Sequence, residues 1–198
     1  NVAPAVNDDE DSEKQAGTTA AEEKKPTEDL LLTNTTKTIT EDTTFKNISL
    51  ASSTLNLSPG IFLKADKLDI SDNSKVAIIP DFVSNGTSGP VTIEITGEIN
   101  LYGLIIYEGV KDKVSNFLLP GGELRLISNK LSIFEKGMVS VNGTNSIDTL
   151  SGNGSDGGKI SISVKTLEVS GKLSAEGGGS LCSKKESCKG GRGGKIIF

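Results

Sequence analysis

The chain lacks histidine and tryptophan, and it has only two cysteines and two tyrosines among its 198 residues. Without histidine, a frequent zinc ligand and the usual neutral-pH general base are missing, so we expect no metal site and no cofactor. Arg125 and Arg192 are the only arginines and form no basic stripe, which argues against nucleic-acid binding. No apolar run approaches the roughly 18 residues of a membrane-spanning helix, so we expect no transmembrane segment.

The acidic residues are concentrated at the start of the chain. Residues 1–30 contain nine acids and three lysines, a charge of 3 − 9 = −6, so the total of −5 leaves about +1 for the remainder. This segment has almost no large apolar side chains, and we predict a disordered acidic tail over 1–30 followed by a folded region over 31–198. The tail is either a solvated spacer or a polyanion that holds cations, a mineral surface or a basic partner.

Several features favour a secreted or cell-surface location. The chain begins at Asn1 and not at methionine, so we expect a processed end from which any signal peptide has been removed. Cys182 and Cys188 flank a short polar loop, and we predict a local disulfide between them. Six N-x-[S/T] sequons are candidate glycosylation sites, although a surface rich in Ser, Thr and Asn also produces sequons by chance. They are Asn34, Asn47, Asn56, Asn85, Asn142 and Asn153.

Alternating apolar residues dominate the body of the chain, most clearly from residue 159 to residue 178. A period of two indicates strands that point alternate side chains into a core. Bends of one or two residues divide this stretch into three short predicted strands. Their expected inward residues are Ile160, Ile162 and Val164, then Leu167 and Val169, then Leu173 and Ala175.

The same unit recurs, with first strands beginning near residues 61, 91, 124, 160 and 196, at steps of 30, 33, 36 and 36. A constant unit with variable polar or glycine-rich loops at one corner is typical of a β-solenoid. The bends lack the Asn-Gly or Asp-Gly pairs of tight hairpins, although period two alone leaves a β-sandwich open. Twelve of the 23 glycines follow residue 150, and we expect them to supply positive φ and close backbone approach where the loops leave and rejoin the coil.

The stretch from Gly157 to Gly178, G-G-K-I-S-I-S-V-K-T-L-E-V-S-G-K-L-S-A-E-G-G, resembles the glycine-rich repeats of right-handed parallel β-helix proteins of the pectin-lyase-like type. The resemblance covers residues from about 50 to 198. It implies a fold and an extracellular setting, and it carries no catalytic residues to this chain.

A polysaccharide-processing enzyme needs carboxylates and cations along one outer face. The outward acids Glu94, Glu98, Glu123 and Glu168 occupy different places in the unit, so we predict no catalytic residue.

Residues 151–156 resemble a calcium-binding turn, but a single imperfect copy of that motif favours a plain loop.

Few aromatic residues are available for a binding surface. Tyr102, Tyr107, Phe117 and Phe134 are the candidates, with Tyr107 on the inward register and Phe117 more suited to capping the coil than to binding a partner.

The sequence therefore predicts an all-β, right-handed parallel β-solenoid of about four to five coils. We expect it to continue beyond Phe198, or else to offer an edge for end-to-end pairing with another chain. The predicted function is a non-enzymatic structural or adhesive protein of the matrix or cell surface, whose partners are matrix, polysaccharide or surface components. Two alternatives stay open: a polysaccharide-processing enzyme or carbohydrate-binding module, and an acidic biomineral-matrix protein.

Overall fold

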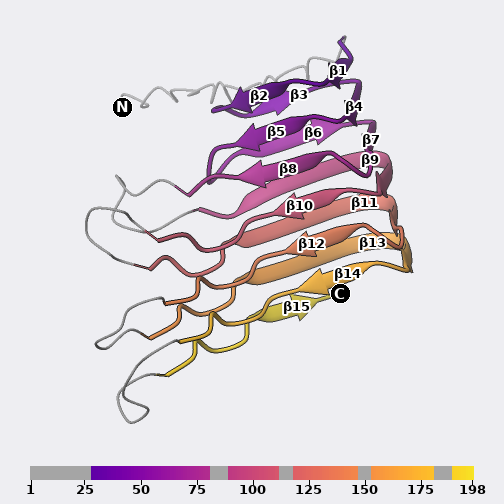
Figure 1. Ribbon diagram of the computed structural model, residues 1–198. Helices are drawn as coiled ribbons and strands as arrows, with labels where there is room; N and C mark the ends of the chain where they lie inside the picture. The colour runs from indigo at the N-terminus through magenta and orange to yellow at the C-terminus, as the bar shows by residue number, and fades with distance from the viewer. Residues whose placement is uncertain (1–27, 81–88, 112–117, 147–152, 181–188) are drawn as a thin grey trace, which may run out of the picture.

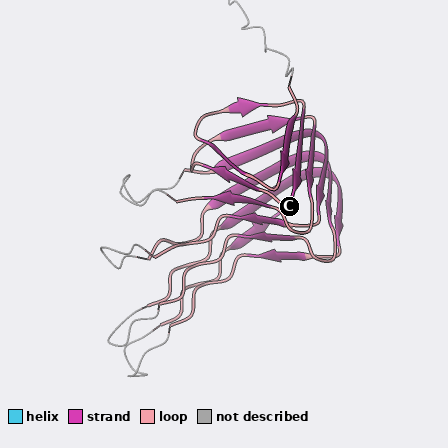
Figure 2. Ribbon diagram, turned by 45° about the horizontal axis from the view of Figure 1, so that its top comes forward, coloured by secondary structure: helices cyan, strands magenta, loops and turns pink. Residues whose placement is uncertain are grey.

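The computed structural model describes residues 28–80, 89–111, 118–146, 153–180 and 189–198. These residues form strands and no helix, so the fold is all-β as predicted. Successive circuits of the chain lay their strands side by side in two sheets, in the manner of a parallel β-solenoid (Figures 1 and 2). Every pairing between the named strands is parallel.

The first sheet has nine strands, of which the three longest each span 11 residues. Its members are β1 (Leu30–Thr33), β3 (Thr43–Thr44), β4 (Asn47–Ala51), β6 (Phe62–Ala65), β7 (Lys67–Ile70), β9 (Val91–Leu101), β11 (Glu123–Ile133), β13 (Lys159–Val169) and β15 (Lys195–Ile197).

The second sheet has six shorter strands and closes each circuit. Its members are β2 (Thr36–Ile39), β5 (Thr54–Leu57), β8 (Lys75–Ile78), β10 (Leu104–Ile106), β12 (Met138–Ser140) and β14 (Lys172–Ser174).

The strand register confirms the predicted alignment of the repeats. Leu124 pairs with both Val91 and Ile160, and Ile160 pairs with Ile196. The prediction of three separate strands per unit is wrong for the longer circuits, because the first two strands join into β9, β11 and β13 around a bend where the ladder is irregular. In the earlier circuit they are separate, as β6 and β7.

Circuits begin earlier than the first predicted copy at Ile61. Strands β1 to β5 already lie in the two sheets, and Leu30, the last residue of the predicted tail, is buried in β1. Glu28 and Asp29 accept hydrogen bonds from Lys46 and Asn47, so the predicted tail is wrong for residues 28–30. Its remainder, residues 1–27, lies outside the described residues.

Stacked aliphatic side chains fill the space between the sheets. One column joins Ile48, Leu68, Ile99, Leu131 and Leu167, one residue per circuit. Its first four members are at most 1% exposed, which confirms the predicted inward register.

Burial weakens in the last described circuit. Val164, Leu167 and Leu173 are only partly buried, and Val169 is 44% exposed, so its predicted core position is wrong. The reason is that β15 pairs with only the first three residues of β13, so the second half of β13 pairs with β11 on one edge and with no described strand on the other.

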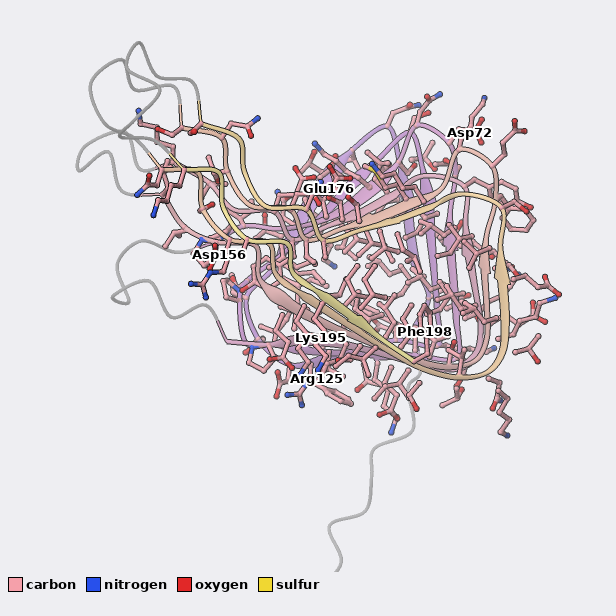
Figure 3. All side chains as sticks on the ribbon, turned by 90° about the horizontal axis from the view of Figure 1, so that it is seen from below. Asp72, Arg125, Asp156, Glu176, Lys195 and Phe198 are labelled. Carbon is pink, nitrogen blue, oxygen red and sulfur yellow. The ribbon has the colours of Figure 1, made fainter. Side chains whose placement is uncertain are left out.

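The core tapers to one side, where the two sheets converge into an arm of extended chain (Figure 3). The Tyr107 side chain is fully buried at this point, opposite Gly122, where a Cβ atom would lie 2.2 Å from the tyrosine ring. We call the described loop segments beyond it the glycine arm. Its outgoing layer comprises 108–111, 141–146 and 175–180, and its returning layer comprises 118–122, 153–158 and 189–194.

Hydrogen bonds in the glycine arm repeat every three residues, in contrast to the period of two in the sheets. Gly154 and Gly157 donate from their backbone N–H groups to carbonyls of the next circuit, at 3.0 and 2.9 Å. Ser155 and Gly158 donate instead to carbonyls of the outgoing layer, at 3.1 and 2.6 Å. Polyproline II has three residues per turn and no hydrogen bonds within the chain. The arm shares this period, so its segments pack as neighbouring extended chains that are hydrogen-bonded to one another in several directions.

Close approach of the two layers explains the glycines. A Cβ atom on Gly121 would lie 1.8 Å from the Val141 carbonyl oxygen of the facing layer. Successive circuits of one layer approach as closely, since a Cβ atom on Gly191 would lie 1.8 Å from the Ser155 carbonyl oxygen of the preceding circuit. The predicted close backbone approach is confirmed. The predicted positive φ is wrong for the arm, because Gly60 is the only described glycine with a positive φ.

Gly191 and Gly193 form a matched pair that tests this packing. A Cβ atom on Gly193 has its nearest neighbour at 4.0 Å. We expect Gly191→Ala to lower the free energy of unfolding by about 3 kcal/mol, because the Ser155 carbonyl of the preceding circuit must move. Gly193→Ala should be neutral, or stabilising by at most about 1 kcal/mol through the unfolded chain. Urea unfolding of both variants measures the difference, and equal effects would contradict the close-packed arm.

Candidate functional site

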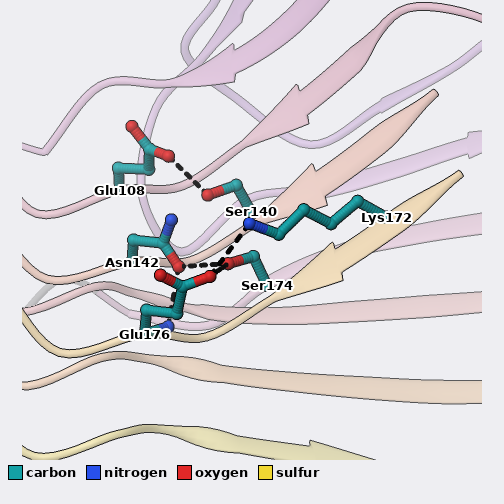
Figure 4. Close-up of polar contacts among 6 residues, drawn as sticks. All are labelled: Glu108, Ser140, Asn142, Lys172, Ser174 and Glu176. Carbon is teal, nitrogen blue, oxygen red and sulfur yellow. Dashed lines mark hydrogen bonds and ion pairs between the residues drawn. The ribbon is translucent and has the colours of Figure 1, made fainter. Parts of the chain in front are cut away.

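Six polar side chains from three circuits gather on the outer face of the second sheet, where it passes into the glycine arm. They are Glu108, Ser140, Asn142, Lys172, Ser174 and Glu176 (Figure 4). The Ser140 hydroxyl donates to the Glu108 carboxylate. The Ser174 hydroxyl lies 2.8 Å from Asn142 Oδ1 and 2.9 Å from Glu176 Oε1. Lys172 Nζ also lies 2.9 Å from Glu176 Oε1, and this hydrogen bond holds the Glu176 pKa below its ordinary value. The cluster therefore joins neighbouring circuits.

Four Asn and Asp side chains make a second kind of link between circuits. The Oδ1 atoms of Asn142 and Asn145 accept hydrogen bonds from the N–H groups of Glu176 and Gly179 in the next circuit, at 2.7 and 2.6 Å. In the returning layer, Asn153 and Asp156 accept in the same way.

The donors in the returning layer are the N–H groups of Lys189 and Arg192, at 2.8 and 2.7 Å. These amides point away from both layers, so an Asn or Asp one circuit earlier supplies the acceptor they need. The residues were not singled out as a set from sequence. The available signal was the spacing of three in N-G-T-N (142–145) and N-G-S-D (153–156).

The predicted outward acids do not meet in one place. Glu123 pairs with Lys159 in the strand register, and its Oε1 lies 3.0 Å from both Lys159 Nζ and Arg125 Nη2. Glu94 lies in another column, opposite Ile127, and pairs with Lys64 at 3.7 Å. The arrangement neutralises Glu123 and does not set it beside a second acid.

Further acids on the first sheet are also paired. Glu168 lies 3.0 Å from Lys130 Nζ and accepts a hydrogen bond from Ser132, contacts that lower its pKa. Glu98 faces Lys130 in the register. Within the described ranges, no group of three acidic or cysteine side chains is placed to bind a metal ion.

The calcium-turn hypothesis falls partly outside the described residues, which exclude Ser151 and Gly152. In the described part, Asn153 and Asp156 direct one oxygen each to a backbone N–H of the next circuit. Those oxygens therefore link neighbouring circuits of the arm.

Two of the predicted aromatic residues meet on the outer surface. Tyr102 and Phe134 occupy equivalent positions in successive circuits and stack with ring centroids 3.9 Å apart and an interplanar angle of 3°. Tyr107 is buried, as its register predicted. Phe117 lies outside the described residues, so its capping role stays a prediction.

The sequons are spread over several surfaces. Asn34 lies at an exposed turn with φ of 51°, and Asn47 donates to Asp29 at 2.9 Å. Asn56 is partly exposed in β5, and Asn142 and Asn153 lie in the glycine arm. Glycosylation at these residues stays a prediction. Asn85, Cys182 and Cys188 lie outside the described residues, as does the predicted disulfide.

Comparison with known proteins adds no relative. No family model matches the chain, and neither a curated protein nor a solved structure matches it. The described residues include no helix long and apolar enough to cross a bilayer.

The ion pair of Glu123 predicts a specific pH response. The hydrogen bond from Lys159 is the largest cause that lowers the Glu123 pKa, followed among the favourable contacts by that from Arg125. A carboxyl group whose pKa is lower in the folded state than in the unfolded state stabilises the fold at pH values above its unfolded pKa, which is about 4.3 for Glu. This stability is lost as the pH falls through the pKa of the folded state. We expect Lys159→Met to raise the Glu123 pKa toward its ordinary value and to make the loss of stability below about pH 4.3 less steep.

Carboxyl ¹³C titration of Glu123 and urea unfolding across the acid range measure these two effects. Lys75→Met is the matched control, since Lys75 has no ion-pair partner among the described residues. An unchanged Glu123 titration in Lys159→Met would show that the pair does not form in solution.

Proposed function

We propose that this chain is a non-enzymatic structural or adhesive component of an extracellular matrix or cell surface. In this proposal the chain is a right-handed parallel β-solenoid of four to five coils, related to the glycine-rich β-helix repeats that its sequence resembles. Parallel crossover connections are right-handed in nearly all known sheets, which supports the proposed handedness. The acidic segment that precedes β1 serves as a spacer in this proposal.

The observation that carries the proposal is how the described polar side chains are used. Asn142, Asn145, Asn153 and Asp156 bind backbone amides of the next circuit. The carboxylates of Glu123, Glu168 and Glu176 each contact a lysine. An active site needs side chains that are available to the substrate and whose pKa values are shifted to suit catalysis. Most of these contacts instead join successive circuits into a continuous stack, as a rod-like scaffold requires, while the Glu176 carboxylate bonds Lys172 and Ser174 within its own circuit.

An extracellular setting agrees with the surface chemistry. Asn34 and Asn153 are exposed sequons, and Cys182 and Cys188 are spaced for a local disulfide. Polysaccharides and matrix components are the partners that such a surface of hydroxyl, amide and paired charged groups suits.

One observation favours the polysaccharide-processing alternative. A shallow groove of about 350 Å³ lies on the first sheet and includes Glu94, Asn129 and Lys165. A carboxylate and an ammonium group beside a groove are of the residue types that act as general base and general acid. Glu94 is therefore the residue on which the two functions make opposite predictions.

The test is incubation of the full chain with soluble and insoluble polysaccharides, followed by measurement of new reducing ends and unsaturated sugar products. We expect product release no greater than that of buffer alone, from both the native chain and the Glu94→Gln variant. Product release by the native chain that Glu94→Gln abolishes would contradict the structural function and establish the enzyme.

A further inference from the structure

The outer corner that follows the first sheet carries a groove of about 420 Å³ beside Tyr102. This volume lies within the range of about 300–1,000 Å³ that is usual for ligand pockets. The groove is formed by β4, β7 and the end of β9, so its walls come from three successive circuits of the rigid backbone ladder.

Tyr102 offers one face of its ring to this groove. Phe134 of the following circuit covers the opposite face in a parallel stack. One circuit earlier, the equivalent position is Ser71, and one circuit before that it is Ala51. Because both are small, the aromatic column stops at Tyr102 and the groove occupies the space where a further ring would stack. The tyrosine is 43% exposed, and its stacking partner fixes its orientation.

Polar groups line the floor next to the ring. Asn100 Nδ2 donates to Asp69 Oδ1 at 2.8 Å, and Lys67 Nζ lies 2.9 Å from Asp69 Oδ2. Each of these side chains keeps further hydrogen-bonding capacity, since a carboxylate oxygen accepts more than one bond and an ammonium group donates three. The Lys67 and Asp69 charges cancel, so the floor offers donors and acceptors without a net charge.

We propose that this groove binds a pyranose ring of a neutral polysaccharide, stacked on Tyr102 and hydrogen-bonded to Asp69 and Asn100. One face of a pyranose ring presents C–H groups and suits an aromatic ring, while its hydroxyls both donate and accept. The balanced charge of the floor favours neutral sugars over uronates. This inference rests on the proposed adhesive function and assigns that function a ligand and a place.

Isothermal titration of the full chain with cellohexaose, chitohexaose and mannohexaose tests the site, with hexagalacturonate as the acidic comparison. We expect at least one neutral hexasaccharide to bind more tightly than the acidic one. Tyr102→Ala should weaken that binding about tenfold or more, through loss of the stacking surface. Tyr102→Phe keeps the ring and should bind as the native chain does.

Ser71→Phe provides a second variant that leaves Tyr102 in place but extends the aromatic column into the groove. It should also weaken binding about tenfold or more. Ile79→Ala is the control, because it truncates another exposed apolar side chain that lies outside the groove. Tyrosine ring NMR signals add a direct readout, since Tyr102 should shift with sugar and the buried Tyr107 should not.

Two results would overturn the site. If a neutral sugar binds and both Tyr102→Ala and Ser71→Phe bind it equally well, the ligand lies elsewhere and the adhesive function stands. If no neutral sugar binds, the groove is not a sugar site, while the non-enzymatic function is still judged separately by its own product assay.

Discussion

The structure depends on two layers of backbone approaching to hydrogen-bonding distance in the glycine arm. Between the sheets, stacked Ile, Leu and Val side chains hold the layers apart, as in other packed β-structures. Where the layers converge, the buried Tyr107 ring packs against Gly122. Beyond it, carbonyl oxygens occupy the positions that Cβ atoms would need, as at Gly121 and Gly191. Glycine thus allows each circuit to extend past its apolar core without leaving a void.

The close approach of the two backbone layers changes the period of the backbone hydrogen bonds from two residues to three. In a strand, N–H groups point alternately to two neighbours, whereas in the arm successive groups point in three directions. One direction meets the next circuit, the second meets the facing layer, and the third points outward, where no backbone is available. Asn153 and Asp156 supply that third acceptor from the preceding circuit. Each of these bonds ties one circuit to the next, which gives the Asn or Asp at every third residue a structural reason.

The sequence predicted the parallel repeats because their inward residues alternate clearly and recur at the correct register, as Val91, Leu124 and Ile160 show. It did not reveal the circuits before Ile61, since β2 has only Ile39 buried and β3 only two residues, too few to display a period. Nor did it predict an ordered arm, because a three-residue period of glycines with Asn and Asp resembles loop composition. The stack of Tyr102 on Phe134 joins residues 32 positions apart (134 − 102). That contact depends on the exact loop length between circuits, which no local pattern specifies.

Native-state hydrogen exchange of the arm amides, measured by NMR on the full chain, distinguishes a hydrogen-bonded, close-packed arm from a solvated loop. We expect slow exchange at Gly154, Ser155, Gly157 and Gly158, whose N–H groups donate to backbone carbonyls. Asp156 should exchange fast between them, because its amide donates to no acceptor among the described residues. Pro120 stands at the equivalent position of the previous circuit and has no side-chain oxygen to accept it. Uniformly fast exchange from 154 to 158 would show that the arm is an ordinary solvated loop and would contradict the account.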